Sequence, residues 1–395
     1  MVEHDDSEWL PEIPDGLESL TPNSGGVVDP ADLVGREQEL TRLHEAVIAG
    51  GAHVTGERRM GKTSLVKKLQ DDLVDTVTAI YVSAETESLE LFAHRLLGRL
   101  RQNRLVSQRI SQWEKEVGGD LNLTFAGLIK LSVSAKGTKP AGLKSEMPTE
   151  IDVLDLLAFQ NSDPVVLIID EITYLCKHLG QKAAQEFMSE LRSRRQSGGP
   201  PMVISGSIGL HHELDDLHSV ADLWTVEVGP LSQDEAVVLA ARLFLGIGVE
   251  PTPGLVAELI TQTSAIPFYM HAVADKLRYR DDLDIDDVVN DCLDKNDWKT
   301  IEYETRLEEY YNYGADGAKQ AKTVLDLVAV ADGAVSVDAI TARLAIENPD
   351  LAPTRDDLLV LLRKLEMDHY LSREENGERM SSPLLARIWC HLRRL

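Results

Sequence analysis

Cysteine, a secretion signal and long apolar runs are scarce or missing in this 395-residue chain. The three cysteines, Cys176, Cys292 and Cys390, lie far apart and form no C-x-x-C pair. This spacing argues against a disulfide framework or a cysteine metal site and is typical of a reducing cytoplasm. The chain does not open with a basic segment followed by an apolar one, and its longest apolar run, residues 165–169, is too short to span a bilayer. We therefore expect a cytoplasmic protein without a membrane partner.

Basic residues are also scarce. Lys and Arg number 40 against 66 Asp and Glu, so the formal net charge is −26. A chain with this balance repels nucleic acid unless a local basic patch overrides the field. The nearest such patches are short, at residues 192–195 and 393–394. DNA is therefore a disfavoured partner.

Residues 1–32 carry acidic side chains and neither Lys nor Arg. Their composition predicts a solvated acidic arm. We favour the alternative, a partly ordered arm that docks onto a surface through its apolar side chains, which are Trp9, Leu10, Ile13, Leu17 and Leu20.

One glycine-rich stretch organises the rest of the chain. Residues 56–63 read G-E-R-R-M-G-K-T and fit the phosphate-binding pattern G-x-x-x-x-G-K-[ST]. Its glycines let the backbone approach a phosphate, and successive N–H groups with the next helix N-terminus attract anionic oxygen. Lys62 is expected to reach the β- and γ-phosphates of ATP, and the Thr63 hydroxyl to bind Mg²⁺.

The context of the loop fits the motif. A short apolar strand at residues 52–55 precedes it, and an amphipathic helix at residues 64–69 follows it. Arg58 and Arg59 either contact phosphate or are simply exposed. The residues of the loop that we expect to hold ATP are Gly56, Arg59, Met60, Gly61, Lys62, Thr63 and Ser64.

Strand and helix patterns alternate from residue 33 to residue 230, which predicts an α/β fold with a parallel sheet and helices on both faces. Residues 165–171 form a continuous apolar run that ends in two carboxylates, as expected of a strand buried on both faces. We expect this strand beside the loop strand, with ligands at the carboxyl ends of the strands. A helix is expected over residues 149–159. Residues 118–140 predict an inserted β-hairpin that either contacts a partner or has no function.

The strands stop after residue 230, and the pattern becomes helical. A capping box at Ser232 and Glu235 opens a small helical domain. The acidic residues 281–297 predict a solvated helical face or a linker. Three further helices and a hairpin with Asn376-Gly377 at its turn predict a winged helix. From residue 315 onward, 13 acidic residues outnumber 11 basic ones, so packing on a protein is at least as well supported as DNA reading.

These divisions predict four parts. They are an acidic arm at residues 1–32, a P-loop ATPase domain at 33–230, a helical lid at 231–300 and a winged helix at 301–395.

The two carboxylates after the apolar strand carry the predicted chemistry. Asp170 is expected to hold the Mg²⁺ shell, and Glu171 to orient and polarise the water that attacks the γ-phosphate. The alternative is that they only end the strand and cap the next helix. Ser205 and Ser207 end the neighbouring strand and either sense the γ-phosphate or its water, or are simple turn residues at Gly206.

Arginines close the helix between these two strands. One of Arg192, Arg194 and Arg195 could act as an arginine finger into a neighbouring subunit. The alternative is a cationic helix terminus that satisfies the helix dipole. The histidines show no metal-ligand spacing.

Four segments together resemble the archaeal-type ATPase family of STAND and AAA+-related, ORC-like P-loop proteins: residues 33–37, 56–65, 167–171 and 204–209. The resemblance implies an ATP-driven switch, with Val34, Gly35 and Arg36 near the adenine. It also implies that Pro267, within the lid segment Ala265-Ile266-Pro267, packs on the nucleotide. Relatives often carry Gly where this chain has Ala265.

Three functions remain open. The first is an ATPase that couples nucleotide state to homo-oligomerisation or to control of a partner or effector protein in trans, as in defence or regulation. The alternative is a DNA-associated, ORC-like or loader-like ATPase that uses the winged helix. The third is a scaffold that holds ATP without hydrolysing it, against which Lys62, Asp170 and Glu171 argue.

Overall fold

The computed structural model describes residues 10–104, 107–108, 111, 120–126, 128–134, 150–152, 165–206, 210–214, 217–298, 303–304, 307, 317–347 and 353–395. The chain divides into two compact units. The unit that we call the sheet unit comprises Asp29–Gly56 and Lys62–Val228. The other, the helical unit, comprises Met1–Val28, Glu57–Gly61 and Gly229–Leu395. The middle of the glycine-rich loop therefore belongs to the helical unit, while its first glycine and its lysine belong to the sheet unit.

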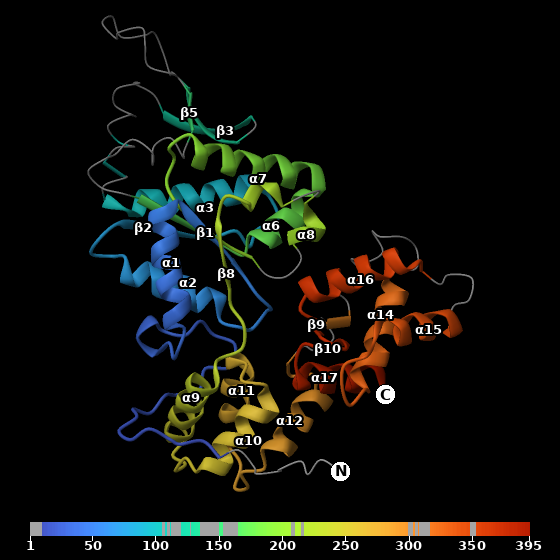
Figure 1. Ribbon diagram of the computed structural model, residues 1–395. Coiled ribbons are helices and arrows are strands. Elements are labelled where there is room, and N and C mark those ends of the chain that lie inside the picture. The colour runs from blue at the N-terminus through green and yellow to red at the C-terminus, as the bar shows by residue number, and fades with distance from the viewer. Residues whose placement is uncertain are drawn as a thin grey trace, which may run out of the picture. The chain divides into compact units, whose positions relative to one another are not determined.

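A five-stranded sheet forms the centre of the sheet unit, in the order β2–β6–β7–β1–β8 (Figure 1). Every neighbouring pair is parallel, which confirms the predicted fold class. The strands are β1 Gly51–Thr55, β2 Thr78–Ser83, β6 Val165–Asp170, β7 Met202–Ser205 and β8 Trp224–Glu227.

One predicted neighbour was wrong. The apolar strand β6 does not lie beside the loop strand β1, because β7 pairs with both of them and separates them. Periodicity predicts that a strand is buried on both faces, but strand order depends on which connection crosses which strand. The consequence is that the strand ending at Ser205 lies next to the strand ending at Asp170.

Helices cover both faces of the sheet. The helices are α1 Glu37–Ala49, α2 Lys62–Asp72, α3 Leu89–Gln102, α6 Ile172–Leu179, α7 Gln181–Gln196 and the short α8 Leu210–Glu213, with 3₁₀ turns η1 Pro30–Asp32 and η2 His218–Val220. Helices α1 and α2 contact each other and the sheet. Helices α3, α6 and α7 contribute to one hydrophobic cluster with the sheet.

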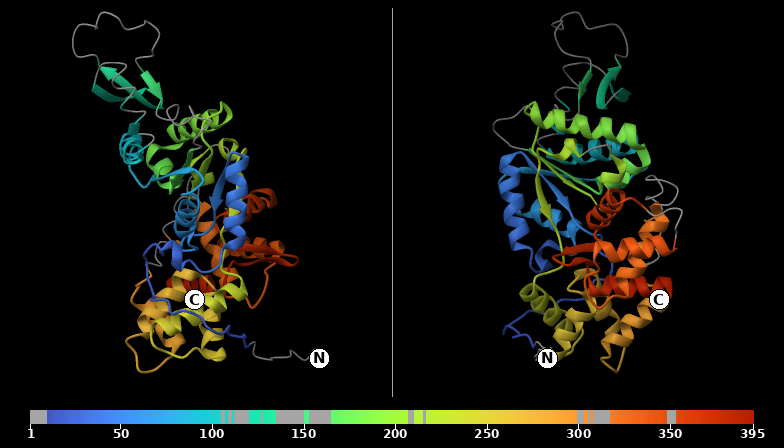
Figure 2. Two further views of the ribbon diagram at one scale, coloured as in Figure 1. Left: turned by 90° about the vertical axis from the view of Figure 1, so that its left-hand side faces the viewer. Right: turned by 45° about the vertical axis from the view of Figure 1, so that its right-hand side comes forward.

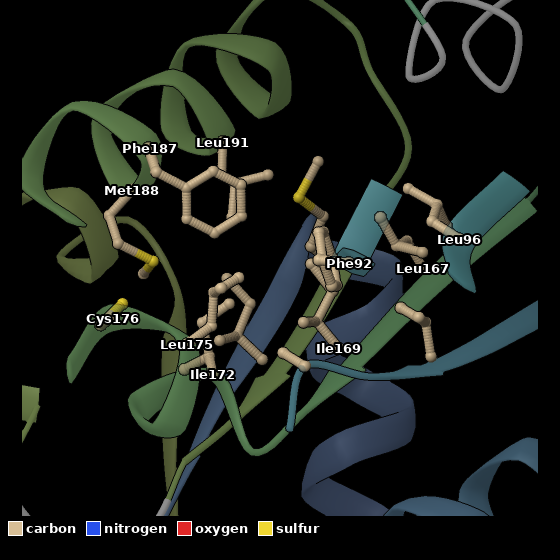
Figure 3. Packing of buried hydrophobic residues seen from close by; sticks show 14 of the residues in the cluster. Phe92, Leu96, Leu167, Ile169, Ile172, Leu175, Cys176, Phe187, Met188 and Leu191 are labelled. Carbon is tan, nitrogen blue, oxygen red and sulfur yellow. The ribbon is translucent and has the colours of Figure 1, made fainter. Parts of the chain in front are cut away.

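The alternation of β6 explains these two layers. Val165, Leu167 and Ile169 join the cluster with α3, α6 and α7, so the intervening Val166 and Ile168, which are also buried, face the other side. In that cluster Phe187 of α7 meets Phe92 of α3 edge to face, with ring centroids 5.8 Å apart (Figure 3). Burial on both faces is what a continuous apolar strand requires.

The predicted hairpin insertion is present as β3 Asp120–Ala126 and β4 Leu128–Ser134, which pair antiparallel. A third strand, β5 Glu150–Asp152, pairs with β4. The helix predicted to begin at residue 149 is therefore wrong at its start, and residues 153–159 lie outside the described residues. A short segment is placed as a strand when a neighbouring strand edge offers backbone partners, which local helix patterning cannot reveal.

The helical unit begins with four helices that pack on one another (Figure 2). They are α9 Gln233–Gly246, α10 Pro253–Thr263, α11 Pro267–Leu277 and α12 Ile285–Asp294. The capping box at Ser232 and Glu235 is formed in both directions. Helix α12 buries Ile285, Val288 and Val289 and exposes most of its Asp side chains, so this acidic segment is a helical face and not a linker.

The C-terminal part has the element order predicted for a winged helix. Helices α14 Gly317–Ala329, α15 Val337–Glu347 and α16 Arg355–Met367 precede the antiparallel strands β9 Leu371–Glu374 and β10 Gly377–Met380. Val335, between α14 and α15, forms a bridge with Glu378 of β10. A last helix, α17 Pro383–Arg393, was not predicted; its Trp389 is fully buried and donates a hydrogen bond to Asp326.

The described part of the N-terminal arm is ordered against the lid helices. The backbone N–H of Leu20 donates to the carbonyl of Arg242 at 2.8 Å, and that of Asn23 to Nδ1 of His271 at 3.1 Å. Leu20 is buried, but Leu10 is exposed, and Trp9 lies outside the described residues. The docking alternative is supported, and the contacts include backbone hydrogen bonds as well as the buried Leu20. No helix in the described part of the chain has the length and apolar character needed to cross a membrane.

The turn into α11 holds two non-glycine residues in the left-handed region, Ser264 at φ 53° and Ala265 at φ 55°. This conformation costs an L-residue about 1–2 kcal/mol that glycine avoids, partly offset by the greater freedom of glycine in the unfolded chain. We predict that Ala265→Gly raises the free energy of unfolding by about 0.5–1 kcal/mol, measured by urea titration. The matched control is Ala342→Gly on the exposed face of α15, which should lower it by about 1 kcal/mol. A loss of stability in both variants would contradict the assignment of strain to Ala265.

Candidate active site

The glycine-rich loop leaves the sheet between two tightly apposed backbone segments. Gly56 follows β1 at φ 139°, and a Cβ on it would lie 2.2 Å from the carbonyl oxygen of Val228. Only glycine fits this approach. Gly61, also at positive φ, lies before Lys62, where α2 begins.

The Lys62 side chain reaches back to the first glycine of the loop. The side chain is 5% exposed, and Nζ donates a hydrogen bond to the carbonyl of Gly56 at 2.8 Å. A buried ammonium beside glycine backbone and a helix N-terminus is a donor set suited to phosphate oxygens. Thr63, half-buried, and Ser64, buried, follow in the first turn of α2. The loop residues therefore fit the polyphosphate of a nucleotide.

Asp170 ends β6 as a buried carboxylate, 2% exposed. Its Oδ2 accepts a hydrogen bond from the Tyr81 hydroxyl at 2.8 Å, and its Oδ1 accepts one from Ser205 Oγ. The two donors come from β2 and β7, the strands on either side of β6. A buried carboxylate oriented from both sides suits a hard cation such as Mg²⁺, which prefers oxygen ligands.

Tyr81 was missed by the sequence analysis. Alternate residues of a strand share a face, so Tyr81 lies on the same face as Ser83, which pairs in register with Asp170. That pattern could have identified it, had the neighbouring strand been known. Burial, followed by the charge of Asp170 and its hydrogen bond, raises the pKa of Tyr81. The hydroxyl therefore stays protonated and remains a donor.

Glu171 is a half-buried, non-glycine residue at φ 57°. Residues in this left-handed region concentrate at functional sites, where surrounding structure holds them. Although Glu171 precedes α6, its side chain makes no capping hydrogen bond. The alternative that this carboxylate only caps the helix is therefore not supported.

The remaining predicted site residues are spread over both units. Val34, Gly35 and Arg36 precede α1 in the sheet unit, where the buried Arg36 pairs with Glu39 at 2.9 Å. Pro267 is the first residue of α11 in the helical unit. Met60 is buried, and the guanidinium of Arg59 lies on Phe268 and Tyr269, directly after Pro267. Ser207 lies outside the described residues. Among the described residues, no group of three or more His, Cys, Asp or Glu side chains could hold a metal ion.

All three candidate finger arginines have partners within their own chain, and Arg194 pairs with Glu190. Arg195 forms a two-pronged ion pair with Asp222, with N···O distances of 2.9 and 3.1 Å, and its side chain is 4% exposed. Arg192 donates to the carbonyl of His218 at 2.7 Å and lies 3.7 Å from Asp222. Burial alone would raise the pKa of Asp222, but the hydrogen bonds and charge of Arg195 outweigh it, so the pKa is lowered. This geometry favours a structural role for Arg195 over a finger.

We predict that Arg195→Met lowers the free energy of unfolding by about 1–3 kcal/mol, because it leaves Asp222 without its bidentate partner. The loss should be fully present above pH 3.8, the ordinary pKa of Asp222, and should shrink as the pH falls and Asp222 protonates. Denaturant titrations at several pH values measure it.

Arg194→Met is the control, since Arg194 pairs with Glu190 at a more exposed position, where an ion pair contributes about 0–1 kcal/mol. If Arg195 were an arginine finger, Arg195→Met would leave the free energy of unfolding unchanged and abolish ATP turnover.

Comparison with known proteins bears on the fold that carries these residues. Residues 32–205 match the family model described as AAA ATPase domain. The Walker-type ATPase of Pyrococcus abyssi has a similar structure, with a TM-score of 0.64 and 17% identity over 94% of this chain and 99% of that one. At this identity the likeness establishes the fold alone. No curated protein sequence matches the chain significantly.

Two further solved structures align over most of the chain. The ORC2 protein of Aeropyrum pernix does so at a TM-score of 0.46 and 12% identity, covering 91% of this chain and 92% of that one. A RuvB variant of Thermotoga maritima does so at 0.38 and 14%, covering 92% and 96%. Likenesses this weak support no argument. The domain match makes residues 32–205 similar to an AAA ATPase domain. Together with the Pyrococcus structure and the parallel sheet, it supports the fold of a P-loop ATPase for this chain.

Proposed function

We propose that this chain binds ATP with Mg²⁺, hydrolyses it slowly, and couples its nucleotide state to self-assembly or to the control of a partner protein. The observation that carries the proposal is the arrangement of β6 and the loop. Lys62 is buried and donates to the carbonyl of Gly56 at the end of β1, and Asp170 and Glu171 lie at the end of β6 in the same parallel sheet. The carboxyl ends of parallel strands meet at one edge, where ligands bind in such folds.

The residues of the chain have separable tasks in this proposal. Bound ATP with Mg²⁺ supplies the phosphoanhydride and the cation that neutralises its charge. Lys62 and the N–H groups of the loop bind the phosphates, and Thr63 and Asp170 supply oxygen ligands. Tyr81 and Ser205 hold the Asp170 carboxylate in place. Glu171 orients the attacking water and accepts its proton.

The surface of α16 favours a protein partner over DNA. In a winged helix this third helix is the one that enters a DNA groove. Here it exposes Leu359 and Val360, at 41% and 54%, beside Asp356 and Asp357. Carboxylates repel phosphate, and paired apolar side chains are typical of a protein interface. The ORC-like alternative is supported only by the order of helices and strands in the C-terminal part, which is that of a winged helix.

Substitution of the loop lysine tests nucleotide binding. Lys62→Ala should weaken ATP binding by about 100-fold, because charged hydrogen bonds to phosphate are worth about 1.5–3 kcal/mol each. Calorimetric titration with Mg²⁺ and ATP measures the change. Lys68→Ala is the matched control, since Lys68 lies on the same helix but pairs with Asp72 at the surface. Equal affinity in wild type and Lys62→Ala would refute ATP binding by this loop.

Substitution of Glu171 tests the switch. Glu171→Gln should keep ATP affinity and lower turnover by about 10²–10⁴-fold, as for loss of a general base. The mass of this variant from light scattering should rise with ATP and not with ADP. The same measurement with duplex DNA tests the alternative: a mass change that needs DNA and weakens with salt would favour the ORC-like function. Normal turnover would show that Glu171 is not the base.

A further inference from the structure

The loop residues Glu57 and Arg59, which stand at unspecified positions of the G-x-x-x-x-G-K-[ST] pattern, are joined by a chain of hydrogen bonds that runs through the helical unit. Arg59 Nη1 donates to the hydroxyl of Tyr269 at 2.6 Å. The hydroxyls of Tyr269 and Tyr303 lie 3.0 Å apart, and Tyr303 donates to Glu57 Oε1 at 3.0 Å. The series of hydrogen bonds thus begins at Arg59 and ends at Glu57, two residues earlier in the same loop.

The direction of this chain is determined by its two charged ends. Arg59 is a donor only, and ionised Glu57 is an acceptor only. Tyr303 uses its proton on Glu57, so Tyr269 must donate to Tyr303. Each hydroxyl then donates once and accepts once, and hydrogen bonds aligned in this way polarise one another in a buried setting. Burial raises the pKa of Tyr269 despite the opposing charge of Arg59, so its hydroxyl keeps the proton that the chain requires.

The surroundings of the chain are closely packed. Glu57, Tyr269 and Tyr303 are 5%, 1% and 4% exposed. The guanidinium of Arg59 lies 4.8 Å from the centre of the Phe268 ring and also donates to the carbonyl of Trp298. Arg59 is at φ 73°, a backbone conformation that a non-glycine residue keeps only when other contacts hold it.

A further contact extends the chain to the C-terminal strands. Tyr370, 1% exposed and directly before β9, donates its hydroxyl to the backbone carbonyl of Tyr303 at 2.6 Å. The Tyr370 ring also meets that of Tyr303 edge to face, with centroids 6.4 Å apart. Tyr370 thereby links the residue that holds Glu57 to the hairpin of β9 and β10.

We propose that Tyr269 and Tyr303 are positioning residues for the ATP-binding loop, and that Tyr370 couples the conformation of this loop to the C-terminal hairpin. The proposal rests on the proposed ATP binding. The hydrogen-bond chain holds Glu57 and Arg59, and through them the left-handed turn of the loop, in one conformation. Binding of phosphate to the loop and the state of the hairpin then influence each other, because the coupling of two sites is reciprocal.

The test measures the dissociation constant of ATP, turnover at saturating ATP and thermal stability for four variants. Tyr303→Phe keeps the ring and removes the hydroxyl, and it should raise the ATP dissociation constant about 5–10-fold while turnover changes less than twofold. Tyr370→Phe should raise the ATP dissociation constant about 2–3-fold, because Tyr370 reaches the loop only through Tyr303. Thr323→Val is the control for lost stability, since it removes a buried hydroxyl on α14 that bonds to Glu347; its affinity should equal that of the wild type.

The fourth variant, Glu57→Met, separates positioning from simple electrostatics. Removal of a negative charge beside the phosphates would by itself tighten ATP binding. The proposal expects the opposite, a dissociation constant about 5–10-fold higher, and no further loss when Tyr303→Phe is added. Wild-type affinity in either Tyr303→Phe or Glu57→Met, or a Thr323→Val variant as weak as Tyr303→Phe, would overturn the proposal. Failure of ATP binding in the wild type would instead refute the proposed function, and the two outcomes are therefore distinguishable.

Discussion

The parallel pairing of β1 between β7 and β8 is the constraint on which the rest of the sheet unit depends. It brings the end of β1 so close to Val228 that residue 56 has to be glycine. The backbone hydrogen bond from Val228 to Thr55, 2.9 Å long, continues this pairing to the point where the loop begins. Because parallel strands all end at one edge, the same pairing places Ser205 and Asp170 at the edge from which the loop emerges.

The order of the strands determines which side chains surround the Asp170 carboxylate. A buried carboxylate is costly unless hydrogen bonds satisfy it, and here its donors are the hydroxyls of Tyr81 and Ser205, one from each neighbouring strand. The pairing of β7 with β6 places Ser205 beside Asp170. Ser205 therefore supports the predicted metal ligand and is not only a turn residue.

Charge is distributed by function in this acidic chain. The described arginines that sequence reasoning placed in catalysis are bound to carboxylates or carbonyls, as with Arg195 and Asp222, and Lys62 is the buried cation of the loop. Helix α12 exposes carboxylates, and α16 exposes apolar and acidic side chains beside its basic ones. These two helix faces favour the proposed protein partner over a phosphate backbone.

The sequence by itself determined the fold class, the loop with Lys62 and Thr63, the carboxylates Asp170 and Glu171, and the capping box at Ser232. The fold class follows from the alternation of strand and helix patterns, and each of the others is a local pattern whose physics is complete within a few neighbouring residues. The tertiary structure alone decided that β7 separates β6 from β1, that residues 150–152 form a strand, and that Tyr81 supports Asp170. It also decided that Arg59 and Glu57 are joined through Tyr269 and Tyr303, more than 200 residues further along the chain. Such contacts depend on which distant segments are buried together, and no periodicity or spacing in the sequence encodes that choice.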